Sequence, residues 1–134
     1  MMNVTDREAY IRAGHHATKP DALAILSQHE DHRIRRNVAE NPNTSAHILR
    51  TLSEDPHPEV RIEVALNKNT PIELLQILAR DESADVRYAI AEVTKVPKGI
   101  LGFLSKDDNP YVAYRAAATL ALLATLMEMA ACIS

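Results

Sequence analysis

A repeat of 26 residues is the feature that most constrains this chain. Four consecutive segments, 13–38, 39–64, 65–90 and 91–116, align with one another without an insertion. Apolar residues recur at the same places of each copy: Ala13, Ala39, Ala65, Ala91 and Ala117; Leu23, Leu49, Leu75 and Leu101; Leu26, Leu52, Leu78 and Leu104; Ile34, Val60, Val86 and Val112. Because a unit this short cannot bury its apolar side alone, the copies must stack on one another in a solenoid.

The composition favours helices in these repeats. Of the 134 residues, 46% are hydrophobic, and the chain has four tyrosines, one phenylalanine, no tryptophan and three glycines. A β-sandwich or β-barrel normally uses many aromatic strand residues and glycine turns, so these classes are disfavoured. The length is that of one domain. We therefore expect residues 1–134 to form a single all-α domain.

Each repeat contains the pattern of two short helices. The first helix is expected to begin at Thr44 and Thr70, where Thr70, Pro71 and Glu73 have the spacing of a capping box with proline at the first helical position. Val96 replaces this threonine in the fourth repeat, which predicts a weaker cap there. The second helix is expected to follow residues that cap helices well, at Asp31, His57, Ser83 and Asn109.

Acidic and basic residues also recur with the repeat. Asp55 precedes Arg61 by six residues, and Asp81 precedes Arg87 by six. We expect each arginine to bond the inter-helix turn of its own or the next repeat, with the series ending where the pattern breaks, at Arg35 and at Asp107. Exposed ion pairs add little stability, so the expected contribution is to the register between repeats.

The segments VAENPNT…ILRTLSEDPHPEVR and VALNKNTPIELLQILARDESADVR closely resemble the leucine-rich repeat variant, a bacterial relative of HEAT-type α-solenoids. The resemblance implies a right-handed superhelix of paired helices, one of each pair often 3₁₀, that acts as a binding scaffold rather than a catalyst. Some members carry a cysteine-rich iron–sulfur segment, but Cys132 is the single cysteine here, so no such cofactor is expected. The fourth repeat, with Val93, Gly99 and Gly102, is expected to be distorted.

The two ends of the chain differ from the repeats. Thr5 and Glu8 have the spacing of a capping box, which predicts that residues 1–12 form a cap helix equivalent to a second helix. Residues 111–133 continue the last second helix, and Glu128 is the single charge between Ala116 and Ile133. A helix that is apolar on every side must be buried somewhere.

Several burial sites are open to this C-terminal helix. It could fold back over the last repeat, pack against a second copy, dock on a different protein, or enter a membrane, for which 18 residues with Glu128 are a marginal span. We favour a cap that also forms a homodimer. The self-association residues are Leu122, Leu123, Leu126, Met127 and Met129.

One outward column of the second helix is the candidate surface for a partner. Its residues, which we call the ridge, are Tyr10, Arg36, Ile62, Tyr88 and Tyr114. Tyrosine and arginine dominate the energetically important positions of protein–protein interfaces. We expect a scaffold that binds another protein. The alternative is that these side chains cover the seam between stacked repeats and have no partner.

Other functional classes have weaker support. The six histidines do not recur with carboxylates or cysteines at ligand spacing, so no metal site is expected. No phosphate loop, nucleophile elbow or metalloprotease motif is present, and we do not expect an enzyme. Nucleic-acid binding is the second functional candidate, disfavoured by a net charge of −3 and by acids interleaved with the arginines. The N-terminus shows no apolar run of the kind found in signal peptides, which predicts a cytoplasmic protein.

Overall fold

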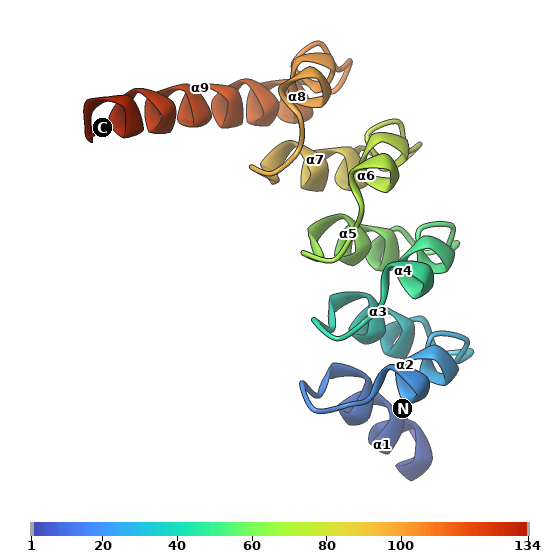
Figure 1. Ribbon diagram of the computed structural model, residues 1–134. Coiled ribbons are helices and arrows are strands. Elements are labelled where there is room, and N and C mark those ends of the chain that lie inside the picture. The colour runs from blue at the N-terminus through green and yellow to red at the C-terminus, as the bar shows by residue number, and fades with distance from the viewer. Residues whose placement is uncertain (1, 134) are drawn as a thin grey trace. The chain divides into compact units, whose positions relative to one another are not determined.

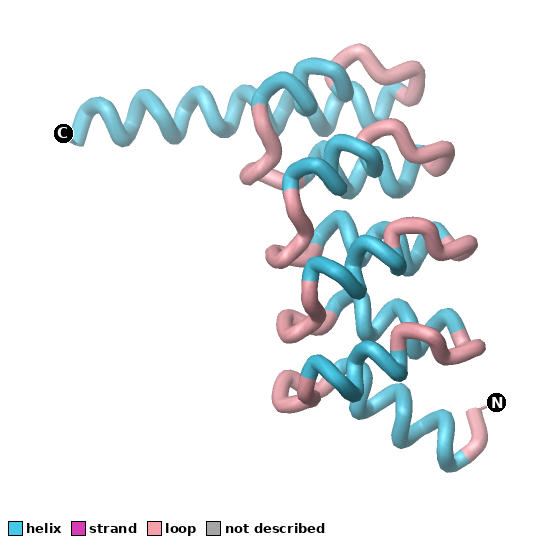
Figure 2. The backbone as a smooth tube through the Cα atoms, turned by 45° about the vertical axis from the view of Figure 1, so that its right-hand side comes forward, coloured by secondary structure: helices cyan, strands magenta, loops and turns pink. Residues whose placement is uncertain are grey.

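The computed structural model describes residues 2–133, and these residues form helices joined by short loops (Figures 1 and 2). The first helices of the repeats are α2 (Pro20–Leu26), α4 (Ala46–Leu52), α6 (Ile72–Leu78) and α8 (Lys98–Leu104). The second helices are α3 (His32–Glu40), α5 (Pro58–Leu66), α7 (Ala84–Glu92) and α9 (Pro110–Ile133), and α1 (Val4–Gly14) precedes them all. Corresponding helices begin 26 residues apart. The predicted all-α solenoid fold of tandem helix pairs is confirmed.

The contacts between helices divide the chain into two compact units, and the division falls between Leu74 and Leu75, within α6. In the first unit α3 packs between α1 and α5, and α2 and α4 lie against these second helices (Figure 2). In the second unit α9 packs on both α7 and α8. The single domain expected from the chain length stays a prediction.

The predicted apolar columns form the core, except that Leu26 of the column with Leu52, Leu78 and Leu104 is half-buried. Leu23, Leu49, Leu75 and Leu101 are fully buried, and the Ile34 column and the alanines from Ala13 to Ala91 are buried as well. Alanine extends no further than Cβ, so it lets second helices approach each other closely. Ala117, the fifth member of the alanine column, is exposed on α9.

The prediction that Thr44 and Thr70 cap the first helices is wrong. Ser45 caps α4, and its hydroxyl accepts a hydrogen bond from the amide of Ile48. Thr44 is fully buried and donates to the carbonyl of Val38, 2.6 Å away in the preceding second helix. Thr70 donates to Val64 in the same way, at 2.5 Å. A buried hydroxyl needs an acceptor, and carbonyls in the last turns of a helix have bonding capacity left.

The capping box predicted at the N-terminus is also wrong. α1 begins at Val4, and Asn3 is the cap, because its side-chain oxygen accepts from the amide of Asp6 at 2.7 Å. The helix continues to Gly14, two residues beyond the predicted end. It packs against α3, as a second helix packs against the next.

Two further expectations do not hold within residues 2–133. Neither helix of a pair is 3₁₀ there, because both kinds are α-helical. The fourth repeat is not distorted: α8 has the same length as α2, α4 and α6, and Leu101 and Leu104 are fully buried. Val96 is buried at the position that Thr44 and Thr70 hold in the preceding repeats, and valine has nearly the shape of threonine without its hydroxyl. The core of the repeat is therefore retained.

α9 is one continuous helix of 24 residues. Its first turns pack on α7 and α8 and bury Val112, Ala116 and Thr119, whereas from Ala121 onward every described side chain except that of Leu123 is exposed. α9 therefore does not fold back over the last repeat as expected. Residues 111–133 contain no glycine or proline and are rich in alanine and leucine, the strongest helix formers, so nothing breaks the helix.

By length and composition α9 could also cross a membrane. Its most apolar 18-residue window has a mean hydropathy of 1.9, and 11% of that window is buried.

Candidate interaction surface

In the first unit, three residues of the ridge lie at corresponding positions of adjacent helices. Tyr10 on α1 and Arg36 on α3 are exposed, and Ile62 on α5 is half-buried. Because α1, α3 and α5 pack in sequence, these side chains follow one another across the unit. The side chain of Asn37 donates to the carbonyl of Tyr10 at 3.1 Å, which ties α3 to α1 beside the ridge.

Charged groups flank this part of the ridge. The Nε of Arg36 lies 3.7 Å from a carboxylate oxygen of Glu63. Burial, together with the nearby charge of Glu40, raises the pKa of Glu63, and Arg36 offsets this shift in part. Glu63 therefore gives up its proton less readily than an exposed glutamate.

The second unit contains the two remaining residues of the ridge, Tyr88 and Tyr114, and a hollow that Tyr88 lines. Tyr88 on α7 is half-buried and lines a hollow of about 290 Å³ between α7 and α9, together with Tyr111 and Val112. Tyr111 and Tyr114 on α9 are 76% and 77% exposed. Sequence reasoning missed Tyr111. Its position holds Arg33, Glu59 and Asp85 in the other repeats, so an aromatic residue replacing charged ones was the available signal.

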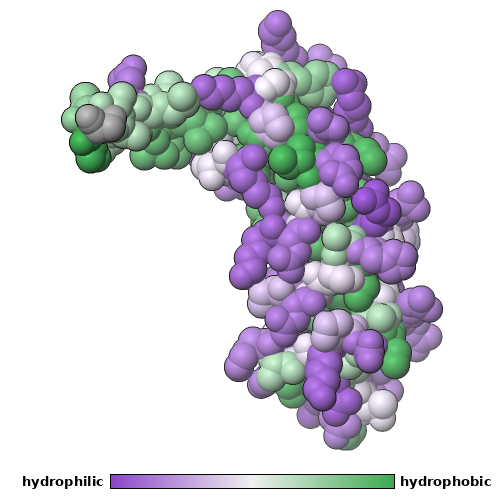
Figure 3. Space-filling model, viewed as in Figure 1, coloured by the Kyte–Doolittle hydropathy of each residue, from purple (hydrophilic) through white to green (hydrophobic). Residues whose placement is uncertain are grey.

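The predicted self-association residues lie together on the part of α9 that extends beyond its contacts with α7 and α8. Leu122, Leu126, Met127 and Met129 are exposed and Leu123 is half-buried. Figure 3 shows the apolar surface that this part of α9 presents. The ammonium of Lys98, at the start of α8, lies 3.2 Å from the sulfur of Met127.

Arginines join the inter-helix turns of neighbouring repeats. The guanidinium of Arg35 donates to the carbonyl of His29 in its own turn and to the carboxylate of Asp55, 2.6 Å away in the next turn. Arg87 bonds the carbonyl of Asp81 and the carboxylate of Asp107 in the same manner. The predicted bonding to the turn of the same or the next repeat is confirmed for these two arginines.

The series was expected to end at Arg35 and Asp107, but both of these residues have a partner. The carboxylate partner stands twenty residues after the arginine rather than six before it, so Arg35 and Asp107 both have partners. The carboxylate of Asp55 is buried and that of Asp107 is half-buried, so these pairs are better shielded from water than the exposed pairs that were expected.

Asparagines form a second set of links, which sequence reasoning missed. The side chain of Asn41 donates to the carbonyls of Ala13 and His15, and that of Asn67 donates to the carbonyls of Ala39 and Asn41. Both side chains are buried. The available signal was the motif Asn-x-Asn-Thr, which occurs at residues 41–44 and again 26 residues later.

Two histidines meet at the edge formed by the inter-helix turns. The rings of His32 and His57 stack with centroids 4.1 Å apart, and a nitrogen of Arg35 lies 3.3 Å from Nδ1 of His57. His29 instead lies 3.4 Å from Asp6. Within residues 2–133, no group of three or more His, Cys, Asp and Glu side chains is placed to hold a metal ion.

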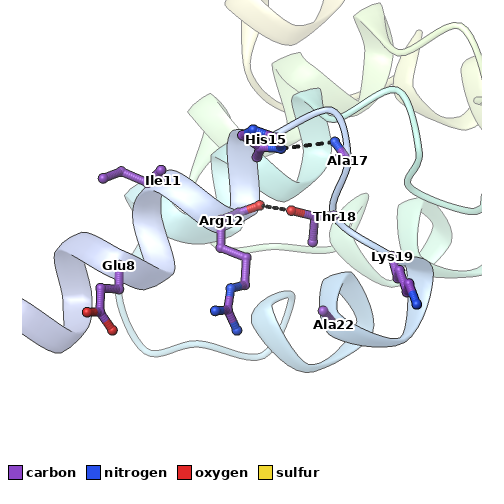
Figure 4. Close-up of a pocket in the computed structure, with 8 residues that line it drawn as sticks. All are labelled: Glu8, Ile11, Arg12, His15, Ala17, Thr18, Lys19 and Ala22. Atoms are coloured by element: carbon purple, nitrogen blue, oxygen red, sulfur yellow. Dashed lines mark hydrogen bonds between the residues drawn. The ribbon is translucent and has the colours of Figure 1, made fainter.

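A hollow of about 630 Å³ lies beside α1 and α2 (Figure 4). Ile11, Ala17 and Ala22 supply its apolar lining, and Arg12 and Lys19 are among the charged groups around it. Ala22 has the position that Ile48 and Leu74 have in the next two repeats. Because alanine is much smaller than isoleucine or leucine, part of the space that they would fill stays open. That replacement was the signal for the hollow, which sequence reasoning missed.

Comparison with known proteins identifies the repeats. The family model of the leucine rich repeat variant matches residues 32–57 and 58–83, two adjacent segments of 26 residues. Residues 32–83 therefore consist of two leucine rich repeat variant repeats. Each matched segment starts at the first residue of a second helix, at α3 and at α5, and ends at the residue before the next one.

The two matched leucine rich repeat variant segments contain the links described above. Asn41, Thr44 and Asp55 fall in the first, and Asn67 and Thr70 fall in the second. No curated protein and no solved structure matches the chain. The leucine rich repeat variant repeats are of a scaffold type, and the comparisons give no partner.

Proposed function

We propose that this chain is a non-catalytic scaffold that binds another protein through the outward side of its second helices. The repeat architecture supports a binding role, because stacked helix pairs present corresponding side chains of successive repeats as one extended surface. The contact residues are the ridge, with Tyr111 added from the structure.

The observation that carries the proposal is the exposure of two neighbouring tyrosines on α9. Tyr111 and Tyr114 present about three quarters of their surface to water, and Tyr111 lines the hollow together with Tyr88. Side chains this exposed contribute little to the core of the unit, so covering a seam does not account for them. Large, rigid aromatic side chains next to a hollow are typical of the anchors of a protein interface.

The test separates binding from folding. With a photoreactive phenylalanine analogue at position 114, the protein is crosslinked in extract of its native cell and the captured protein is identified by mass spectrometry. Binding of that purified partner is then measured for Tyr111→Ala with Tyr114→Ala. We expect Kd to rise at least tenfold with an unchanged melting temperature, since hot-spot truncations cost more than about 1.4 kcal/mol.

Ile25→Ala is the matched control, because Ile25 is a large apolar residue with similar exposure on α2, outside the ridge. Binding that Ile25→Ala weakens as much as the tyrosine variants do would contradict the proposed surface. A mobility shift of duplex DNA that declines steeply with salt would indicate nucleic-acid binding instead.

A further inference from the structure

The part of α9 that extends beyond its contacts with α7 and α8 carries an inference that does not depend on the proposed function. We call residues 120–133 the projecting segment. At 100° per residue, helical geometry places its bulky apolar side chains on one face. This large face consists of Leu122, Leu123, Leu126, Met127, Met129 and Ile133. The opposite face is small and includes Ala121, Ala124, Thr125, Glu128 and Cys132.

The large face continues the stripe by which α9 packs in its first half. Val112, Ala116 and Thr119 occupy the same side of the helix and are buried against α7 and α8. Among the residues that the structure describes, no helix packs along the continuation of this stripe: the side chain of Lys98 reaches the sulfur of Met127, and Leu126 and Met127 remain exposed. The same kind of apolar contact is therefore open to another surface.

A membrane fits this segment poorly. Its 14 residues span about 21 Å, and the hydrocarbon core of a bilayer is about 30 Å thick. Insertion of the whole helix would require Val112 and Ala116 to leave their buried places. A helix that lies on a membrane surface normally has lysines and arginines on its polar face, whereas the polar face here holds Glu128 and no cation.

A second copy of the chain fits it well. Leu122, Leu126, Met127, Met129 and Ile133 expose between 48% and 86% of their surface, together on the order of 600 Å² of mostly apolar area. A stable interface buries roughly 800 Å² per partner, which the adjacent half-buried residues and alanines can complete. The residues of the large face carry no charge, and Glu128 lies on the opposite side. The ammonium of Lys98 on α8 lies 3.2 Å from the sulfur of Met127, at the edge of this face, and its long flexible side chain can turn toward water when two such faces meet.

The contacts of α9 also decide the relative direction of the two helices. In the first half of α9 this side of the helix is occupied by α7 and α8. A parallel pair in register would force the two copies of these helices into the same space. An antiparallel pair that overlaps over residues 120–133 avoids this conflict, because each copy's repeats lie beyond the end of the other copy's helix.

We propose that the large face of the projecting segment binds the same face of a second copy, as an antiparallel helix pair centred between Leu126 and Met127. Each helix covers the stripe that the other leaves exposed. The pair has two-fold symmetry, so the contact is closed and does not extend into a filament.

The first test measures the mass of the purified full chain in solution. Light scattering from 1 to 200 μM should show the mass of two chains, and Leu126→Glu should raise the dimer Kd at least 100-fold, because the contact would bury a carboxylate. Thr125→Glu adds the same charge on the small face and should leave the dimer intact. A monomer at 200 μM, or equal weakening by both variants, would overturn the proposal, and circular dichroism checks that both remain folded.

The second test determines the direction of the helices. In a Cys132→Ser background, Leu126→Cys should form an intermolecular disulfide in oxidising buffer, since the two copies of position 126 lie next to the two-fold axis. Ile133→Cys should not, because its two copies would be about 20 Å apart. The reverse result would overturn the antiparallel pair. Flotation of the chain with phosphatidylcholine–phosphatidylserine vesicles would show that a membrane covers this face instead.

Discussion

At the scale of single residues, buried side chains that bond main-chain carbonyls hold the first unit together. Thr44 is fully buried and its hydroxyl donates to Val38 at 2.6 Å. Thr44→Val keeps the shape and removes the donor, so the carbonyl of Val38 loses that bond. We expect the free energy of unfolding in urea to fall by about 1–2 kcal/mol.

Thr51→Val provides the control for this change, because Thr51 is exposed and its hydroxyl bonds a carbonyl of its own helix at 3.4 Å. Its effect should stay within about 0.5 kcal/mol. Equal losses from the two variants would show that the β-branched substitution itself, rather than the buried hydrogen bond, decides the result.

The buried carboxylate of Asp55 makes stability depend on pH. Burial raises the pKa of Asp55, but hydrogen bonds from Arg35 and from the amide of His57 lower it more, so the net pKa is below that of an ordinary aspartate. The unfolded chain therefore takes up this proton first as the pH falls. Stability present above about pH 4, near the unfolded pKa, is lost as the pH falls through the folded pKa.

Urea unfolding of the native chain between pH 6 and pH 2 should show this loss. Asp55→Asn should be less stable than the native chain at pH 6 and should lose less stability on acidification. A native and a variant curve that run parallel over the whole range would contradict the assignment.

Residues that pack could be predicted from the sequence better than residues that hydrogen-bond. Leu49 and Leu75 are buried as their column indicated, because burial follows from helical periodicity. The carboxylate partner of Arg35 and the carbonyl partners of Asn41 could not be predicted, since they depend on which groups the stacking of two helices brings close together. A polar residue that recurs with the repeat indicates that such a link exists, but it does not show which helix or turn the side chain reaches.

At the scale of the element, α8 contains two glycines that its conformation does not need. A Cβ at Gly102 would meet nothing within 4 Å, and no described glycine has a positive φ. Glycine inside a helix costs about 0.5–1 kcal/mol relative to alanine. Gly102→Ala should therefore raise the free energy of unfolding in urea by about that amount.

Gly14→Ala is the comparison for this prediction. Gly14 lies at the last position of α1, where a Cβ would contact the side chain of Asn37 at 3.6 Å. The gain there should be smaller, because the helix end restricts the backbone less. A loss of stability in Gly102→Ala would show that α8 needs this glycine for a reason other than backbone conformation.

Helix positions were predictable and the course of α9 was not. The 26-residue spacing gave the start of each second helix, because a cap residue followed by an apolar column indicates one boundary. In α9 the residues after Ala116 are mostly apolar on every side, with Glu128 as the single charge before Ile133, so periodicity cannot distinguish a helix that folds back from one that continues. The absence of a glycine or proline was the deciding local signal.

At the scale of the whole molecule, the same kinds of link recur in both compact units. Arg35 with Asp55 in the first unit and Arg87 with Asp107 in the second join turns that are one repeat apart. Asn41 and Thr119 both bond main-chain carbonyls of the preceding second helix, at Ala13 and Ala91. Each link reaches one repeat and no further. Stability should therefore be close to a sum of terms between neighbouring repeats.

Double-mutant cycles test this expectation. Ile34 on α3 and Ile90 on α7 are fully buried in different units, and Val60 is fully buried on α5, which packs against α3. Ile34→Val and Ile90→Val should each cost about 0.5–1.5 kcal/mol in urea unfolding, and their costs should add within about 0.5 kcal/mol. Ile34→Val with Val60→Ala should deviate from additivity by more, because neighbouring side chains share the space that each substitution empties. Strong coupling between Ile34 and Ile90 would mean that packing changes pass through an intervening repeat, and the stability of the chain would then not be a sum over neighbours.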